Sequence, residues 1–276
     1  MTNSGTILIT GATDGLGRAL AEDLARDGAG LILHGRDQAR LDGLAERIAA
    51  LGAPRPRTVT ADFADLGQVR RMAAEVRGQA SRLDALVSNA GIGSGEPDGR
   101  TRRTSADGHE LRFAVNYLAG FLLTLELLPL LRESAPARIV NVASLGQHPI
   151  DFDDLMLEHG YSGARAYGQS KLAQIICGFH LATLIPAHEV SVNSLHPSTY
   201  MPTKIVLEEV GHSVDTLEQG VAATRRLAVG PELAGVTGRF YDRTREARAD
   251  AQAYDPRVRE RLWETSMRLT SAPHSV

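Results

Sequence analysis

The stretch Thr6–Arg18, TILITGATDGLGR, decides the fold. Its first five residues are apolar or β-branched and are typical of a short buried strand. Glycines then recur closely, and glycine lets a backbone turn tightly and approach a phosphate that the N–H groups of a following helix can bind. A strand, a glycine-rich turn and a helix therefore predict a dinucleotide-binding α/β sheet. The residues expected around the phosphates are Gly11, Thr13, Asp14, Gly15, Leu16 and Gly17.

The same alternation continues along the chain. Short apolar runs, suited to strands buried on both faces, alternate with longer segments whose apolar residues recur every three or four positions. This predicts a doubly wound, Rossmann-like parallel sheet of about seven strands with helices on both faces. We expect one domain over residues 1–276, because an α/β domain can reach this length without splitting. The strand-like runs are Thr6–Thr10, Gly30–His34, Thr58–Ala61, Leu83–Ser88, Arg138–Ala143 and Val190–Leu195.

Composition disfavours several classes of protein. The formal net charge of −3 argues against a nucleic-acid partner, which requires clustered excess Lys and Arg. The one cysteine, Cys177, cannot form an internal disulfide and is expected to be a small buried hydrophobe in a reducing cytoplasm. The most apolar stretch, Leu118–Leu131, is shorter than the about 20 residues that a membrane-spanning helix needs. We therefore expect a cytoplasmic protein with no membrane partner. No His, Cys or acidic residues have metal-ligand spacing, so we expect no metal site.

A tyrosine and a lysine four residues apart are candidates for proton chemistry. Tyr167 and Lys171 lie on a predicted helix, Ala164–Leu184, where this spacing places both on one face. A free tyrosine has a pKa near about 10, and a neighbouring ammonium favours the phenolate and lowers that pKa. Ser144 ends the fifth predicted strand, at the sheet edge where doubly wound folds bind ligands.

Taken together, these motifs resemble the short-chain dehydrogenase/reductase family over roughly residues 5–245. The glycines have that family's spacing, G-x-x-x-G-x-G, and its catalytic order is matched by Asn116, Ser144, Tyr167 and Lys171. The separation of 23 residues between Ser144 and Tyr167 resembles the retinol-dehydrogenase-like branch, as do Asp107–Leu111 (DGHEL) and Tyr167–Ala173 (YGQSKLA). Several animal members carry a membrane anchor that is not seen here, so a soluble bacterial member is the expectation.

The resemblance implies an enzyme that moves a hydride between nicotinamide and a carbonyl/alcohol pair. Tyr167 would be the acid/base, and Lys171 would also bind the nicotinamide ribose. Ser144 would hold the substrate oxygen, and Asn116 would complete a water-linked proton relay to the lysine. Further cofactor contacts are implied for Asp62, Phe63, Asn89, Ala90, Gly91, Pro197, Ser198 and Thr199.

The end of the second strand favours NADP(H) as the cofactor. Gly35 stands where NAD-preferring members of the family carry an acid, and Arg36 follows it, suited to a 2′-phosphate. Asp37 is either the N-cap of the next helix or an acceptor for the ribose 2′-OH. Asp14 stands where many NADP-using relatives have a basic residue.

The substrate is expected to be a small-molecule carbonyl compound or alcohol. Some similar bacterial members reduce ketones of polycyclic polyketides, which makes a ketoreductase of hydrophobic or polycyclic, secondary-metabolite-like substrates the leading hypothesis. The segments near 146–165 and 198–215 are expected to form a substrate-side insert and a lid, and 264–276 a loose tail. Pairing of the Leu118–Leu131 and Tyr167 helices across a two-fold axis would give a homodimer or homotetramer. Two alternatives remain open, a nucleotide-sugar epimerase/dehydratase and a non-catalytic NADP-sensing protein.

Overall fold

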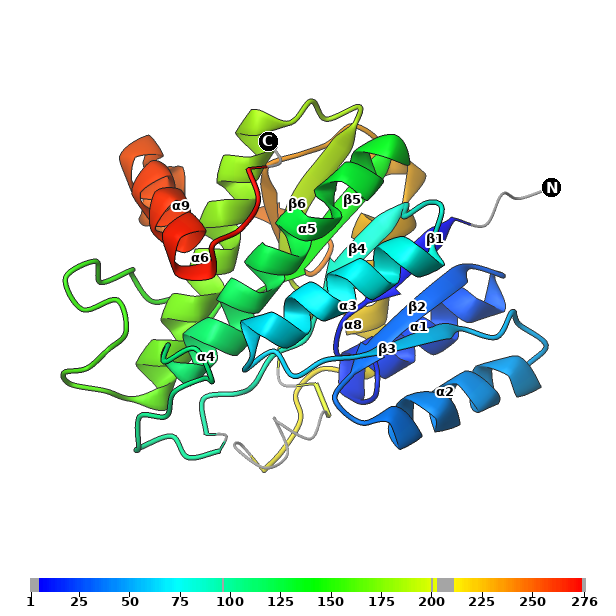
Figure 1. Ribbon diagram of the computed structural model, residues 1–276, viewed down its shortest axis with the longest axis horizontal. Coiled ribbons are helices and arrows are strands. Elements are labelled where there is room, and N and C mark those ends of the chain that lie inside the picture. The colour runs from blue at the N-terminus through cyan, green and yellow to red at the C-terminus, as the bar shows by residue number, and fades with distance from the viewer. Residues whose placement is uncertain (1–4, 96, 200, 203–210, 275–276) are drawn as a thin grey trace.

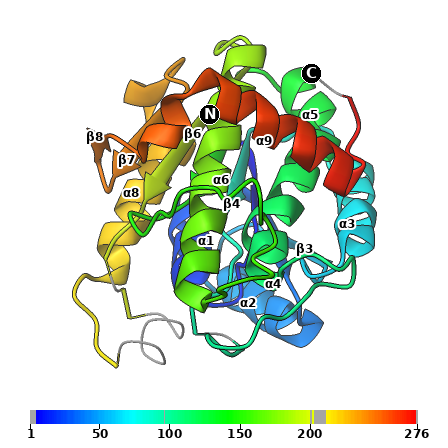
Figure 2. The same ribbon diagram turned by 90° about the vertical axis from the view of Figure 1, so that its left-hand side faces the viewer.

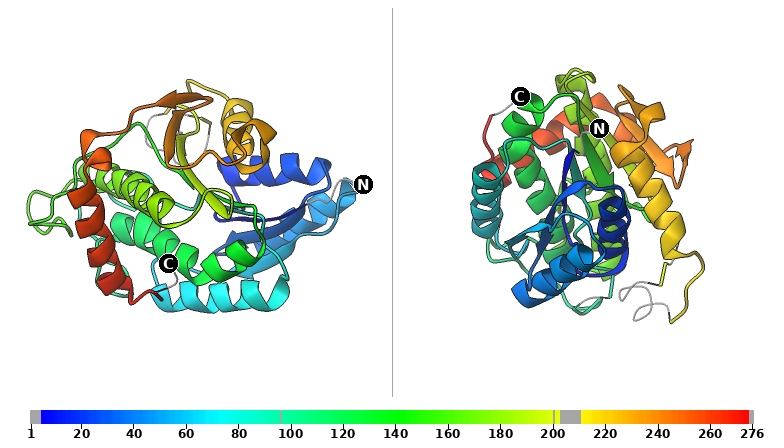
Figure 3. Two further views of the ribbon diagram at one scale, coloured as in Figure 1. Left: turned by 90° about the horizontal axis from the view of Figure 1, so that it is seen from above. Right: turned by 90° about the vertical axis from the view of Figure 1, so that its right-hand side faces the viewer.

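An eight-stranded sheet runs through the described part of the protein, with helices on both faces (Figures 1 and 3). The computed structural model describes residues 5–95, 97–199, 201–202 and 211–274. The strand order is β3-β2-β1-β4-β5-β6-β7-β8, and only the pair β7–β8 is antiparallel. The strands are β1 (Thr6–Ile9), β2 (Gly30–Gly35), β3 (Arg57–Thr60), β4 (Ala85–Ser88), β5 (Ala137–Val142), β6 (Val190–His196), β7 (Arg239–Asp242) and β8 (Arg245–Ala247).

The helices divide into two layers that bury opposite faces of the sheet. Ile7 and Ile9 of β1 pack in the core beneath α1, α2 and α8, whereas Leu8 packs in the core beneath α3, α5 and α6. Burial on both faces explains why the strands are continuously apolar. The helices are α1 (Gly15–Arg26), α2 (Gln38–Ala50), α3 (Leu66–Gln79), α4 (Leu111–Phe113), the π-helical turn η1 (Ala114–Leu118), α5 (Ala119–Glu133), α6 (Gly163–Leu184), α8 (Leu217–Val229), α9 (Pro256–Thr270), and the 3-10 turns η2 (Pro231–Leu233) and η3 (Ala251–Tyr254).

The predicted Rossmann-like sheet is confirmed, with small differences at its far edge. Each of the six predicted strands is present, and the structure adds β7 and β8. These two strands are four and three residues long and carry charged residues at exposed positions, so they lack the apolar pattern that marks the others. β7 still pairs in parallel with β6, and Phe240 and Tyr241 bury their rings in the two cores.

The most apolar helix is a core element. Among the described residues, one stretch, Leu111–Glu133, is long and apolar enough by composition to cross a membrane, and 78% of its most apolar window is buried within the fold. Burial of this kind agrees with the core helix expected around Leu118–Leu131. Cys177 of the neighbouring α6 is likewise buried, as predicted, and burial raises the pKa of its thiol to about 12.

The end of the chain corrects one expectation. Residues 264–270, predicted as part of a loose tail, belong to α9, which lies across α6 and α5 (Figure 2). The helix carries many charged residues, but one face of it is a narrow apolar stripe. Leu262, Ser266 and Thr270 are buried, and the Trp263 ring packs 5.1 Å from that of Phe121.

This docking also removes the surface expected for oligomerisation. Every residue of α6 from 168 to 179 is buried within one chain, and α9 provides part of that cover. The two-fold pairing of α5 with α6 predicted from the sequence therefore lacks a free face. The oligomeric state itself stays a prediction.

Candidate functional site

The glycine-rich turn forms a cradle with no room for side chains. Gly11 and Gly15 have φ values of +66° and +47°, which favour glycine. A Cβ on Gly17 would lie 2.2 Å from the Gly11 carbonyl oxygen, so Gly17 lets α1 pack against the turn. Asp14 caps α1 by accepting a hydrogen bond from Gly15 N at 2.7 Å. The start of α1 can thus present backbone N–H groups and a positive dipole end to an anion.

The tip of β4 is fastened to this turn. Thr10 Oγ1 accepts hydrogen bonds from the backbone N–H groups of Asn89 and Ala90, both at 2.9 Å. The Asn89 amide in turn donates to the carbonyl oxygens of Thr10 and Gly11. A Cβ on Gly11 would lie 2.9 Å from Ala90 Cα, so the two segments touch.

His34 connects the turn to the tip of β3 and was not identified from the sequence. Its Nδ1 accepts from Gly11 N at 3.3 Å, and its Nε2 lies 3.1 Å from the Ala61 carbonyl oxygen. Its ring stacks on Phe63 with centroids 4.4 Å apart. Burial lowers the pKa of His34 to about 4, so the ring is neutral at pH 7 and can accept from Gly11 while donating to Ala61. Asp62 and Phe63 then line the same cleft.

The tip of β2 brings two arginines to the cleft. Arg36 is exposed and lines the cleft. Arg40, which was not predicted although it follows Arg36 by only four residues, also lines it. Arg40 donates to the Thr13 carbonyl oxygen and to Asp14 Oδ2, each at 3.1 Å. Asp37 accepts from Arg40 N, which confirms the N-cap interpretation of Asp37. A Cβ on Gly35 would lie 2.7 Å from Thr13 Cγ2, which leaves no room there for an acidic side chain unless Thr13 moves.

Tyr167, Lys171 and Ser144 meet where β5 ends and α6 begins. Lys171 Nζ lies 5.7 Å from the centroid of the Tyr167 ring. A Cβ on Gly146 would lie 3.4 Å from Ser144 Oγ and 3.9 Å from Tyr167 Cε1, so both side chains border the same space. Ser144 Oγ accepts from Gly146 N at 3.0 Å. The two hydroxyl-bearing residues can therefore reach one substrate oxygen.

Lys171 is buried but accessible from the cleft. Its side chain donates to the Val142 carbonyl oxygen at 2.9 Å and to Gln174 Oε1 at 3.2 Å. Burial lowers the pKa of Lys171 to about 8, which leaves the ammonium mostly protonated at pH 7. A positive charge beside Tyr167 favours the phenolate.

Asn116 lies behind the cleft. It occupies the π-helical turn η1, a feature often found at functional sites. Its Oδ1 accepts from Ile92 N at 2.8 Å, and its Nδ2 donates to the Ile92 carbonyl oxygen and to Ser170 Oγ. The side chain thus holds the segment after Gly91, and the proton-relay role stays a prediction.

The segment after β6 is held by an ion pair that the sequence did not reveal. Asp215 Oδ2 accepts from Ser198 Oγ at 2.8 Å, from Thr199 N at 2.7 Å and from the Arg243 guanidinium. These hydrogen bonds, first that from Thr199 N, lower the pKa of Asp215 to about 2. Of the predicted lid over 198–215, residues 200 and 203–210 lie outside the described residues.

The substrate-side insert is anchored to α6 and to the loop before α4. Gln169 of α6 accepts from Asp151 N at 3.0 Å and donates to the Leu155 carbonyl oxygen. The fully buried Arg112 donates to the Gly93 carbonyl oxygen at 2.8 Å and to the Tyr161 hydroxyl. These contacts fix the insert beside Tyr167.

One cleft of about 1730 Å³ joins these groups at the carboxyl edge of the sheet. Of the predicted site residues, Gly17 and Asn116 do not line it; each instead supports a segment that does. Within the described ranges, no group of three or more His, Cys, Asp or Glu residues could hold a metal ion. The predicted site residues that line the cleft are Gly11, Thr13, Asp14, Gly15, Leu16, Arg36, Asp62, Phe63, Asn89, Ala90, Gly91, Ser144, Tyr167, Lys171, Pro197, Ser198 and Thr199.

Comparison with known proteins shows the family to which the chain is similar. A family model described as short chain dehydrogenase matches residues 5–210. Human "Retinol dehydrogenase 14" is 36% identical, over 95% of this chain and 84% of the relative. A protein of Streptomyces sp. (strain C5) named "Putative daunorubicin C-13 ketoreductase DnrU" is 37% identical, over 95% and 91% of the two chains. The solved structure of a Pseudomonas aeruginosa RhlG/NADP active-site complex superimposes with a TM-score of 0.71 at 26% identity, covering 87% and 95% of the two chains.

Proposed function

The chain belongs to the short-chain dehydrogenase/reductase family, in its retinol-dehydrogenase-like branch, and we propose that it transfers a hydride between NADP(H) and a ketone or aldehyde/alcohol pair. Family membership makes it an oxidoreductase. The observation that carries the proposal is the cleft that Tyr167, Lys171 and Ser144 share with the glycine-rich turn.

The residues around the turn fit a dinucleotide phosphate. The side-chain-free cradle at Gly11 and Gly17 and the start of α1 would hold the pyrophosphate. Asp62 and Phe63 would border the adenine, and Asn89, Ala90 and Gly91 the central part of the cofactor. Pro197, Ser198 and Thr199 would border the nicotinamide.

The arginines favour NADP(H) over NAD(H). Guanidinium groups pair with phosphates in a bidentate manner, and both Arg36 and Arg40 line the cleft at the tip of β2. The crowding at Gly35 disfavours the acid that would bind a free 2′-OH and repel a 2′-phosphate. Solved structures with similar folds include NADP complexes, which supports the same choice.

The chain's own groups would supply the proton chemistry. NADPH, when bound, supplies the hydride. Ser144 holds the substrate oxygen, and the Tyr167 hydroxyl gives its proton to that oxygen as negative charge develops there. The Lys171 ammonium would stabilise the resulting phenolate and hold the nicotinamide ribose. The phenolate would then regain a proton from solvent through Lys171 and the relay that includes Asn116.

The substrate is proposed to be a hydrophobic or polycyclic ketone. Two similar proteins are named for retinol and for a daunorubicin ketone, which supports this choice. A cleft of about 1730 Å³ has room for such a molecule beside a cofactor. We place the enzyme in the cytoplasm and retain a homo-oligomer as a proposal, with any contact made away from the covered face of α6.

Cofactor preference gives the direct test of this proposal. NADPH and NADH oxidation are measured with a panel of polycyclic and aliphatic ketones, for the wild type and for Arg36→Ala. We expect turnover with NADPH in the wild type. In the variant, the KM for NADPH should rise about 10-fold or more, because a charged hydrogen-bond pair is lost. The KM for NADH should change less than about 2-fold. Equal effects on both cofactors would contradict the 2′-phosphate role.

A further inference from the structure

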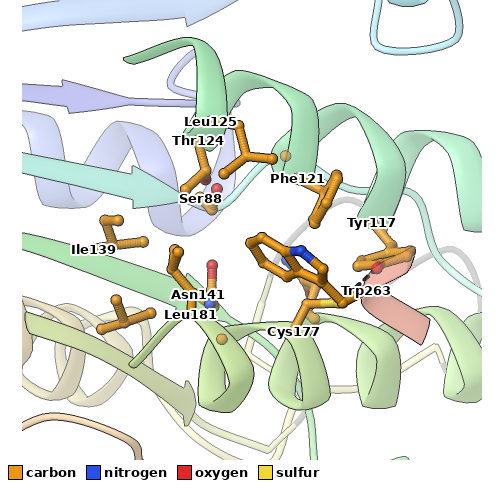
Figure 4. Close-up of a pocket in the computed structure, with 14 residues that line it drawn as sticks. Ser88, Tyr117, Phe121, Thr124, Leu125, Ile139, Asn141, Cys177, Leu181 and Trp263 are labelled. Atoms are coloured by element: carbon orange, nitrogen blue, oxygen red, sulfur yellow. Dashed lines mark hydrogen bonds between the residues drawn. The ribbon is translucent and has the colours of Figure 1, made fainter. Parts of the chain in front are cut away.

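The side of Lys171 that faces away from the cleft contacts groups with no role in the proposed reaction. Behind the lysine, α5, α6, the sheet and Trp263 of α9 line a partly open cavity of about 30 Å³, shown in Figure 4. A cavity needs about 10–15 Å³ to hold one water molecule. Ser88 and Asn141 contribute polar groups to its wall, and Figure 4 shows the Asn141 amide pointing into it. Gln174 also lines this cavity and lies between it and Lys171.

The donors of the lysine can be counted. A lysine ammonium has three N–H donors and no acceptor. Two of them are used at the rear, by the Val142 carbonyl oxygen at 2.9 Å and by Gln174 Oε1 at 3.2 Å. One donor remains for the side of the cleft, where Tyr167 lies. The two rear acceptors therefore determine where the third N–H points.

The orientation of the Gln174 amide follows from the same contact. Because an ammonium only donates, the amide oxygen must face Lys171, which leaves the amide N–H₂ group for other acceptors. Water beside Ser88 and Asn141 in this mostly apolar cavity would be such an acceptor, and Gln174 is itself 7% exposed.

We propose that Gln174 is a positioning residue that holds the Lys171 ammonium from behind, keeping it charged and keeping one N–H directed to Tyr167 and the cofactor. The proposal rests on the role of Lys171 in the proposed function. Val142 contributes only its backbone, so Gln174 is the side-chain acceptor. Among the described groups Tyr167 is the titratable residue that faces Lys171, and no ionised group contributes to the lowered pKa of Lys171, which burial causes.

The charge state can be measured without a substrate, because the chain has two lysines, Lys171 and Lys204. In protein labelled with ¹³C at the lysine ε-carbon, a Lys204→Arg background leaves one NMR signal, which reports the titration of Lys171. Gln174→Met keeps the size of the side chain and removes the acceptor, whereas Gln174→Glu keeps the acceptor and adds a negative charge. Gln169→Met is the matched control, a buried amide on the same helix that hydrogen-bonds to Asp151 and Leu155 and makes no hydrogen bond to Lys171 in the described structure.

The two variants should move the Lys171 titration in opposite directions. From a midpoint of about 8, Gln174→Met lowers it by about one pH unit, and Gln174→Glu raises it by about one unit or more. Gln169→Met leaves it unchanged. In NADPH-dependent ketone reduction, the alkaline limb of the pH profile of Gln174→Met moves down with the midpoint.

Midpoints that stay with the control, or that move in the same direction in both Gln174 variants, would overturn the proposal. If Gln174→Met does not fold, as judged by circular dichroism, the upward shift in Gln174→Glu alone decides it. The titration needs neither turnover nor cofactor. Absence of NADPH-dependent turnover in the wild type would therefore count against the proposed function, and an unchanged titration against Gln174.

Discussion

Charges at the tip of β2 work partly against one another. Arg36 and Arg40 favour a 2′-phosphate, but Asp14 pairs with Arg40 at 3.1 Å and places a carboxylate beside the same site. Hydrogen bonds from Gly15 N and Arg40 lower the pKa of Asp14 although its partial burial acts in the opposite direction, so this carboxylate is ionised at neutral pH. We accordingly expect the proposed preference for NADP(H) to be weaker than two arginines alone would give.

Neutralising Asp14 should strengthen NADPH binding. In Asp14→Asn the N-cap is kept, because Asn caps helices as well as Asp, and the carboxylate beside the phosphate site is removed. We expect the Kd for NADPH to fall about 3- to 10-fold, with the Kd for NADH nearly constant, in fluorescence titrations. Asp42→Asn, an exposed acid on α2 away from the cleft, is the charge-matched control. A parallel change for both cofactors would contradict this account.

His34 should make the folded state sensitive to acid. Its pKa is about 4 in the folded protein and about 6.5 when unfolded, so the unfolded chain binds the proton first as pH falls. The contribution of His34 to the free energy of unfolding is therefore fully present above pH 6.5. About 3 kcal/mol of it is lost as the pH falls from 6.5 to 4. Urea unfolding at pH 7 and pH 4 should show a smaller loss in His34→Gln. Equal losses in both proteins would rule this contribution out.

At the scale of elements, α9 packs over the apolar helices α5 and α6 and covers them from solvent. The strands and the helix carrying Tyr167 were predicted because their patterns are local, with apolar runs for strands and a three- to four-residue period for helices. The continuation of α9 from residue 264 to Thr270 was not predicted, since its exposed face is rich in charge and its apolar stripe is narrow. Tyr117 of η1, Cys177 of α6 and Ser266 of α9 meet in hydrogen bonds between segments far apart in the sequence.

Trp263 is the side chain whose loss should detach α9. The centroid of its ring lies 5.1 Å from that of Phe121 and 4.9 Å from that of His180. The ring also lines the cavity behind Lys171. Because the ring is partly exposed, Trp263→Ala should lower the free energy of unfolding by about 2–3 kcal/mol, below the cost for a fully buried tryptophan. Denaturation followed by circular dichroism measures this. The exposed neighbour Glu264 gives the control Glu264→Ala, expected within about 0.5 kcal/mol of wild type; equal stability of the two variants would exclude this role.

At the scale of the whole molecule, the sheet brings the ends of β1, β2, β4, β5 and β6 to one edge and so assembles a site from distant residues. The glycine-rich turn and Ser144 could be predicted because each follows an apolar strand. Asn116, Tyr167 and Lys171 could be predicted because their order resembles that of a known family. Arg243 and Asp215 could not be predicted. Their contacts with each other and with Thr199 depend on how β7 and β8 pair at the edge of the sheet. Gln174 follows Lys171 by one turn of α6, and Arg40 follows Arg36 by four residues, but the contacts of both are seen only in the structure.

The central claim is that Tyr167 donates the proton in a hydride transfer from NADPH to a carbonyl compound. The most direct measurement compares ketone-dependent NADPH oxidation by the wild type and by Tyr167→Phe, together with the Kd for NADPH of each. The account predicts a fall in kcat of at least about 100-fold, the usual contribution of a general acid, with the Kd changed less than about 3-fold. A Phe variant that keeps more than a tenth of the wild-type kcat would contradict it.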